Sequence, residues 1–287
     1  MKNQIKIIET CAQMREYSLN LKTENKTIGL VPTMGYLHEG HLSLVDAASE
    51  KCDAVVVSIF VNPTQFGKNE DFSKYPRNFE RDIELLSQKK VDAVFFPSAK
   101  EIYSENYQTY VEVEEITKKQ EGEFRPEHFK GVTTIVSILF NCVKPDVAVF
   151  GRKDAQQAAI IKRMTDDLQF GIKVIVAPII REIDGLAMSS RNVYLSGKER
   201  KDALVLRKSL DSAVKMIESG ERNTKKIISG MKGLYSKVDS AELQYIRIVE
   251  EKSFQEIEIL DKGNSYYILI ACKIGATRLI DNELIGL

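Results

Sequence analysis

Short β-branched apolar runs alternate with amphipathic stretches over the first 180 residues. Strands are predicted at residues 27–31, 53–61, 93–96, 147–150 and 173–177. Several of these runs are apolar on both faces, which is typical of strands buried inside a parallel sheet. Helical periodicity fills the intervals at residues 42–50, 79–89, 132–143 and 155–169. The alternation predicts an α/β fold, a Rossmann-like doubly wound parallel sheet.

The pattern changes after Arg191. Two amphipathic helices are predicted at residues 198–219 and 224–237, with Ser219-Gly220 between them. Two strand-like stretches follow at residues 243–249 and 266–271, before a short tail. This order indicates a smaller C-terminal α+β domain. We therefore predict two domains, residues 1–180 and residues 181–287.

Composition narrows the possible classes of protein. The 287 residues contain 41 Lys plus Arg and 41 Asp plus Glu, so the dense basic patch needed for non-specific nucleic-acid binding is not expected. The four cysteines are far apart in the sequence, which favours reduced thiols over a disulfide framework or a zinc site. The N-terminus lacks a signal-peptide core, and the apolar run at 54–61 is too short to span a bilayer. We expect a soluble, cytoplasmic protein.

A first polar cluster follows the predicted strand at 27–31. It ends in His38-Glu39-Gly40-His41, which holds two of the chain's three histidines at a strand-to-helix turn. The helix N-terminus attracts an anion, and the glycine lets the backbone approach it closely. A zinc site is disfavoured, because the His-Glu-x-x-His spacing is one residue longer and contains no glycine. A phosphate is therefore the expected ligand.

A second cluster follows the predicted strand at 53–61. Asn62 and Gln65 carry neutral amides, which suit the hydroxyl and carboxylate groups of a small acid. An ordinary Asn-Pro turn is the alternative interpretation. The position of the cluster at the carboxyl end of a strand makes a functional role equally plausible.

Two further clusters carry cations. Arg152 and Lys153 lie between Gly151 and a helix start, an arrangement suited to clamping phosphate, and Asp154 reads equally well as the helix N-cap. Ser189-Ser190-Arg191 offers two hydroxyls and a guanidinium to a triphosphate. Taken alone, that triplet reads more readily as a solvated loop.

Together these segments resemble the HIGH-type nucleotidyltransferase superfamily and, within it, the pantothenate synthetase family. Any one motif is only suggestive, whereas five motifs in the family's order between residues 31 and 192 are highly specific. A weaker match lies in Arg278-Leu279-Ile280-Asp281-Asn282. The five motifs are Val31-Pro32-Thr33-Met34-Gly35…His38-Glu39-Gly40-His41, Phe60-Val61-Asn62-Pro63…Gln65-Phe66, Arg125-Pro126…His128-Phe129…Gly131-Val132, Gly151…Lys153-Asp154…Gln157 and Asp184-Gly185-Leu186-Ala187-Met188-Ser189-Ser190-Arg191-Asn192.

Two positions depart from the family pattern. Arg152 stands where Glu or Gln is more frequent, so only its backbone is expected to contribute. Glu127 stands where Gly usually precedes the motif's His128, which makes the conformation of that turn uncertain. Neither departure affects the main assignment.

The resemblance implies a ligase that condenses (R)-pantoate with β-alanine to pantothenate, on the route to coenzyme A. ATP would be cleaved to AMP and pyrophosphate through a pantoyl-adenylate. The resemblance also implies dependence on Mg²⁺ and a homodimer. The domain at 1–180 would bind ATP and pantoate, and the domain at 181–287 would cover the active site.

Residue roles carry over from the same resemblance. His41, as proton donor or electrophilic stabiliser, His38 and Lys153 would be catalytic. Pantoate would bind Gln65, Gln157 and Asn62, and β-alanine would bind Gln65. The residues expected to contact ATP are Met34, Gly35, Tyr36, Leu37, His38, Glu39, Gly40, His41, Gly151, Arg152, Lys153, Asp154, Ile180, Met188, Ser189, Ser190 and Arg191.

No side chain is assigned as a metal ligand. Asp82 is one acidic candidate near Mg²⁺, although a charge on a helix surface is the stronger interpretation.

Three other functions fit parts of the pattern. A nucleotidyltransferase that leaves AMP on its product would keep the histidine turn, but would have no reason for the amides of Asn62, Gln65 and Gln157. A tRNA-charging enzyme is disfavoured, because the neutral chain lacks a basic RNA-binding extension. An ATP-sensing module would bind nucleotide without chemistry.

Overall fold

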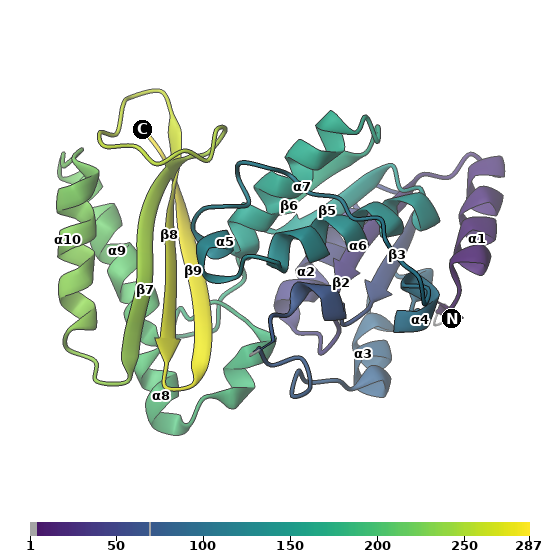
Figure 1. Cartoon of the computed structure of the whole chain (residues 1–287), viewed down its shortest axis with the longest axis horizontal. Helices are drawn as coiled ribbons and strands as arrows, with labels where there is room; N and C mark the ends of the chain where they lie inside the picture. The colour runs from purple at the N-terminus through teal and green to yellow at the C-terminus, as the bar shows by residue number, and fades with distance from the viewer. Residues whose placement is uncertain (1–4, 69) are drawn as a thin grey trace. The chain divides into compact units, whose positions relative to one another are not determined.

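The computed structural model describes residues 5–68 and 70–287, which form two compact units (Figure 1). The first unit comprises the described part of Met1–Arg152 together with Gln157–Pro178. The second comprises Lys153–Gln156 and Ile179–Leu287. Each unit has a sheet and a hydrophobic core of its own.

A six-stranded parallel sheet forms the centre of the first unit, in the order β1-β4-β3-β2-β5-β6. From β2 the chain proceeds outward through β3 to β4, whereas β5 lies on the other side of β2 and leads outward to β6. The direction of winding therefore reverses between β2 and β5. The strands are β1 (Lys6–Ile8), β2 (Ile28–Thr33), β3 (Ala54–Ile59), β4 (Ala93–Phe95), β5 (Val147–Gly151) and β6 (Lys173–Ala177).

Helices cover both faces of this sheet, as the doubly wound prediction requires. The α-helices are α1 (Cys11–Thr23), α2 (Glu39–Ser49), α3 (Phe79–Leu86), α4 (Ala99–Ile102), α5 (Glu121–Phe124), α6 (His128–Val143) and α7 (Ala155–Asp167). Short 3-10 helices follow two of the strands, η1 (Pro63–Gln65) after β3 and η2 (Arg152–Asp154) after β5.

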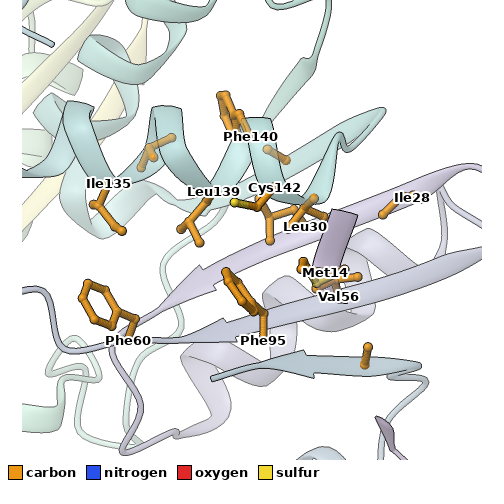
Figure 2. Close-up of a cluster of buried hydrophobic side chains, with 14 of the residues drawn as sticks. Met14, Ile28, Leu30, Val56, Phe60, Phe95, Ile135, Leu139, Phe140 and Cys142 are labelled. Atoms are coloured by element: carbon orange, nitrogen blue, oxygen red, sulfur yellow. The ribbon is translucent and has the colours of Figure 1, made fainter. Parts of the chain in front are cut away.

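Alternate residues of each central strand enter different cores. In β3, Val56 packs against α1 and α6, and Figure 2 shows it facing the same cluster as Phe95, Phe140 and Cys142. The next residue, Val57, joins the core beneath α2 and α3. Both faces of the sheet are therefore buried from solvent, which explains why the central strands are apolar at successive positions.

The predicted strands and helices of the first unit are all present, with shifted ends. The short helices α4, α5, η1 and η2 were missed, and so were β1 and α1, which lack a strong hydrophobic pattern. The strand β1 has only three residues and buries one of them. In α1 the buried positions are Met14, Ser18 and Leu21, so a serine interrupts the apolar stripe.

The second unit combines helices with a three-stranded antiparallel sheet in the order β7-β8-β9. The predicted helix at 198–219 is wrong as a single element, because the chain breaks at Ala203 into α8 and α9. The predicted tail is also wrong, because it forms the ten-residue strand β9. The elements are η3 (Ser190–Tyr194), α8 (Gly197–Asp202), α9 (Leu204–Glu218), α10 (Thr224–Tyr235), β7 (Ala241–Glu250), β8 (Ser265–Ile274) and β9 (Thr277–Gly286).

Within residues 5–68 and 70–287, no helix combines enough length with enough apolar character to cross a bilayer.

Replacing Phe95 with alanine tests the core of the first unit. Phe95 is 0% exposed, so Phe95→Ala should lower the free energy of unfolding by about 3–5 kcal/mol through lost burial and a residual cavity. Urea unfolding followed by circular dichroism measures the change. Leu168→Ala is the control, because Leu168 is 52% exposed and should change stability by less than about 0.5 kcal/mol. Equal effects of the two substitutions would contradict the described packing.

Candidate active site

The reversal of strand order places three predicted polar clusters at neighbouring strand ends. The histidine turn follows β2, Asn62 and Gln65 follow β3, and Gly151-Arg152 closes β5. Because these strands are parallel and adjacent in the order β3-β2-β5, their carboxyl ends lie at one edge of the sheet. Open parallel sheets bind ligands at such a reversal, so this edge is the candidate site.

The histidine turn begins α2 through a reciprocal pair of hydrogen bonds. Nδ1 of His38 accepts from the backbone N–H of Gly40 at 3.1 Å, and Nδ1 of His41 accepts from the N–H of His38 at 3.3 Å. The ring centroids lie 4.1 Å apart. Because each Nδ1 accepts a hydrogen bond, each neutral ring carries its proton on Nε2. The turn therefore holds two imidazoles as neutral N–H donors beside the positive end of a helix.

The segment before the turn adopts an unusual backbone conformation. Gly35 and Tyr36 both have positive φ values, 82° and 51°. The left-handed region is readily adopted by glycine but disfavoured for tyrosine. A Cβ on Gly35 would also lie 3.0 Å from Ile59 and 3.1 Å from Asp82. This conformation needs support from elsewhere in the fold.

Asp82 of α3 supplies that support. Its side chain is 1% exposed, and its two carboxylate oxygens accept from the N–H groups of Tyr36 and Leu37, each at 2.7 Å. Burial raises the pKa of Asp82, and the two backbone N–H groups oppose that rise. The neighbouring Arg81 donates to the carbonyl oxygen of Leu37 at 2.9 Å, with its guanidinium 5.0 Å from the Tyr36 ring.

The expectation that Asp82 is a surface charge is therefore wrong. Both of its oxygens accept backbone N–H groups, so its observed role is to hold the chain before the histidine turn. The sequence contains a signal that was overlooked. Asp82 shares a helix face with Phe79, Ile83 and Leu86, and a carboxylate on an apolar face must find partners when the helix packs.

Asn62 orients the glutamine of the second cluster. It is 1% exposed, and its Nδ2 donates to Oε1 of Gln65 at 3.2 Å and to the carbonyl oxygen of Gly131 at 3.0 Å. Its Oδ1 accepts from the Tyr103 hydroxyl at 2.8 Å. These bonds fix the direction of the Gln65 amide, whose Nε2 lies 3.0 Å from the sulfur of Met34. Gln65 therefore lies beside the segment that leads into the histidine turn.

The close approach of α6 to η1 requires a glycine at position 131. A Cβ there would lie 2.5 Å from the carbonyl oxygen of Thr64 and 2.7 Å from the nitrogen of Gln65. Both distances are shorter than van der Waals contact, so any side chain at position 131 would clash with the backbone of η1. This clash explains the glycine of the motif.

The backbone of Gln65 is also held from the start of α6. Its carbonyl oxygen accepts from Nδ1 of His128 at 2.9 Å and from Arg125 at 3.3 Å. Arg125 makes a two-pronged ion pair with Glu70 at 2.6 and 2.7 Å. Sequence reasoning gave Arg125 and His128 only a place in a family motif and gave no indication of Glu70. Their contacts show that they fix the loop that carries Gln65.

The other predicted site residues divide between the two units. Gln157, in the first turn of α7, belongs to the first unit. Lys153, Asp154, Ile180 and residues 188–191 belong to the second. Within the second unit, the Ser189 hydroxyl caps η3 by accepting from the N–H of Arg191 at 3.2 Å.

Over the described ranges, no three His, Cys, Asp or Glu side chains gather closely enough to hold a metal ion.

Comparisons with known proteins agree with this architecture. A family model described as pantoate-beta-alanine ligase matches residues 6–284. The chain is 50% identical over 282 residues to pantothenate synthetase of Thermotoga petrophila, covering 98% of this chain and 100% of the relative. It is 52% identical over 281 residues to that of a Thermoanaerobacter species, covering 98% of each.

Solved structures give the same result. The crystal structure of pantothenate synthetase from Thermus thermophilus has a TM-score of 0.91 at 39% identity, over 97% of this chain and 99% of that one. The pantoate-beta-alanine ligase of Francisella tularensis, complexed with beta-gamma ATP and beta-alanine, has a TM-score of 0.79 at 35% identity, over 98% of each chain.

The role of Asp82 is testable by an isosteric change. In Asp82→Asn only one side-chain oxygen remains, so the N–H of Tyr36 or Leu37 loses its acceptor. We expect the Kd for ATP, measured by titration calorimetry, to rise about tenfold, since about 1.4 kcal/mol of support is lost. Glu84→Gln on the exposed face of α3 is the matched control and should leave the Kd unchanged. An unaltered Kd in Asp82→Asn would exclude the clamp.

A second prediction concerns the pH dependence of stability. Burial, with a further contribution from Arg125, lowers the pKa of His128 from 6.5 to about 4. Between pH 6.5 and 4, His128 is protonated in the unfolded chain but neutral in the folded protein. The free energy of unfolding should therefore fall as the pH drops from 6.5 to 4 and level off below pH 4. The loss attributable to this residue is on the order of 2–3 kcal/mol. Urea unfolding at pH 7 to 4 measures it.

The matched variant is His128→Gln, whose amide can donate to the Gln65 carbonyl but does not titrate in this range. Its stability should decline less between pH 6.5 and 4 than that of the wild type. Parallel pH profiles would show that His128 is not the responsible group.

Proposed function

The chain belongs to the pantoate-β-alanine ligase family, and we propose that the strand ends at the β2–β5 reversal carry out the chemistry of that family. As a member, the protein is an ATP-dependent ligase that joins (R)-pantoate to β-alanine by an amide bond. Pantothenate is formed through a pantoyl-adenylate, with release of AMP and pyrophosphate. ATP and β-alanine, the ligand types named for the Francisella tularensis structure, are its substrates together with pantoate.

The two-step course follows from the chemistry of the carboxylate. A free carboxylate does not acylate an amine at neutral pH, because its leaving group would be oxide. The pantoate carboxylate oxygen therefore attacks the α-phosphorus of ATP, and the bond to pyrophosphate breaks. The free amine of β-alanine then attacks the activated carbonyl carbon, the bond to AMP breaks, and the amine loses a proton. Neither step needs a covalent enzyme intermediate.

The observation that carries the proposal for the nucleotide is the histidine turn. Each Nδ1 accepts a backbone N–H group, which assigns the ring proton to Nε2, the atom through which each imidazole can donate to a phosphate oxygen. Negative charge on those oxygens redistributes as pyrophosphate leaves, and preorganised donors stabilise it without having to reorient. We assign His41 and His38 this electrostatic role. In the second step, we assign Nε2–H of His41 as the proton donor to the phosphate oxygen of the departing AMP.

The small acids are assigned to the amide cluster. Gln65 has its amide direction fixed by Asn62 and its backbone fixed by His128, so it can present a donor to pantoate and β-alanine with little ordering cost. Asn62 already makes bonds through both its oxygen and its nitrogen, so holding Gln65 is its first role, and direct contact with pantoate stays a prediction. Gln157 stays the second predicted pantoate ligand.

Residues of the second unit are assigned by their chemistry alone. Lys153 and Arg191 are cations suited to the triphosphate, and Ser189 and Ser190 offer hydroxyls. A cover over the bound nucleotide would shield the adenylate from water, which is the function we propose for residues 181–287. Catalysis by Lys153 likewise stays a prediction.

Three further features rest on the family resemblance. We propose that Mg²⁺ accompanies ATP, that the protein is a homodimer, and that it acts in the cytoplasm. The described side chains do not form a metal cage, and Asp82 is engaged by the backbone. A magnesium ion would instead be held mainly by phosphate oxygens and water, and would neutralise phosphate charge when bound.

Isotope exchange between pyrophosphate and ATP tests the function directly. The ligase should exchange label only when pantoate is present, and β-alanine should not be required. An enzyme that leaves AMP on another product would need a different acceptor, and an ATP sensor would show no exchange. Absence of pantoate-dependent exchange under saturating Mg²⁺ would overturn the assignment.

The role of His41 predicts a specific loss of rate. His41→Ala removes one preorganised donor and should cost about 2–4 kcal/mol of transition-state stabilisation, read from kcat/KM for ATP. Ser49→Ala at the other end of α2 is the control, because the Ser49 hydroxyl donates to the Asp46 carbonyl oxygen within the helix, away from the histidine turn. Near-normal turnover of His41→Ala would remove His41 from the mechanism.

A further inference from the structure

The strand β9 carries two adjacent buried polar residues, Asp281 and Asn282, that the mechanism does not use. Asp281 and Asn282 are each 2% exposed, although β9 is an edge strand of its sheet. Successive strand residues point to opposite faces, so a polar group is buried on each side of the strand. Such burial costs free energy unless each group has specific partners. The identity of those partners indicates what the pair is for.

Asp281 makes a two-pronged ion pair with Arg181. Its carboxylate oxygens accept from the guanidinium of Arg181 at 2.7 and 3.0 Å. Oδ1 also accepts from the N–H of Asn282 at 2.8 Å. A paired guanidinium and carboxylate fix both distance and plane, so this contact sets the orientation of Arg181 and not only its charge.

Arg181 in turn closes the turn that leads to the serine-arginine motif. It donates to the carbonyl oxygen of Gly185 at 3.1 Å and to that of Asn282 at 3.3 Å. Across the same turn, the N–H of Met188 donates to the carbonyl oxygen of Ile180 at 3.0 Å. Ile180 and Met188 are both predicted ATP contacts. The guanidinium thus connects β9 to the turn at residues 180–188, which is predicted to bind the nucleotide.

Asn282 holds the other predicted nucleotide-binding segment of this unit. Its Nδ2 donates to the carbonyl oxygen of Lys153 at 2.9 Å. Burial raises the pKa of Asp281, while the charges of Arg181 and Lys153 act in the opposite direction, so the lysine charge is also near the pair. Two adjacent residues of β9 therefore contact two segments that lie far apart in the sequence.

We propose that Asp281 and Asn282 are positioning residues for the nucleotide. They hold the Lys153 backbone and the turn at residues 180–188 in the separation that ATP requires. This inference rests on the proposed function, because it takes both segments as part of the ATP site. Neither residue touches the reacting atoms, so the expected effect lies in ATP affinity.

A purely structural role would predict something different. Buried ion pairs add little net stability compared with well-packed apolar residues, so a strand that only completed a core would gain nothing from this pair. The groups that Asp281 and Asn282 contact also belong to segments predicted to bind ATP. Asn282 binds a backbone group of Lys153, and Asp281 acts through Arg181 on the turn between two predicted ATP contacts.

The test uses two substitutions that leave shape or charge in place. Asn282→Asp is isosteric but cannot donate to the Lys153 carbonyl oxygen. Arg181→Lys keeps the positive charge but cannot make the two-pronged pair with the Asp281 carboxylate. Each should raise the KM for ATP about tenfold, with the KM for β-alanine changed less than about twofold. Tyr235→Phe is the matched control, because it removes a buried hydrogen bond of the same unit, to Ser209 at 2.9 Å. Its KM for ATP should equal that of the wild type.

The outcomes separate this inference from the proposed function. Absence of pantoate-dependent exchange in the wild type would overturn the function itself. With an active wild type, an unchanged KM for ATP in both variants, or an equal rise in Tyr235→Phe, would overturn the positioning role.

Amide hydrogen exchange on the wild-type protein gives a second test that does not depend on the variants folding. ATP should slow exchange at residues 281–283 together with residues 180–188. Slowing at 180–188 without any at 281–283 would contradict the proposal.

Discussion

Burial of both sheet faces governs where chemistry can occur in the first unit. Successive residues of β2, β3 and β5 enter two separate apolar cores, so neither face can accept a charge. Polar side chains are therefore confined to the strand ends. Winding reverses between β2 and β5, and in open parallel sheets the strand ends at such a reversal are where ligands bind.

The loops at that edge are held by buried polar side chains from other elements. Asp82 binds two N–H groups before the histidine turn, and Asn62 binds Gln65 and Gly131. Both are 1% exposed, so their hydrogen bonds compete little with water. The segment at Gly35 and Tyr36 has positive φ angles, and the carboxylate of α3 supports that conformation by accepting the N–H groups of Tyr36 and Leu37.

Patterns within one element were predictable, whereas contacts between distant elements were not. The apolar runs predicted all the strands from β2 to β6, because these strands are apolar at most successive positions. The strand β9 was missed, since Arg278, Asp281 and Asn282 interrupt its apolar pattern, and only partners far away in the sequence make their burial possible. The histidine turn was visible because strand, glycine and helix start are adjacent, but Asp82 lies more than forty positions from the N–H groups it binds.

Asp82 and Asn282 use the same physical device in different units. Each is a buried polar side chain whose partner is a backbone group of a segment predicted to bind ATP. An apolar residue of similar volume at either position would take this hydrogen bond away from the backbone group of the held segment. A backbone partner also leaves the side chains of the held segment available for the ligand. Binding energy for ATP then need not be used to order these loops, which preserves it for stabilising the transition state.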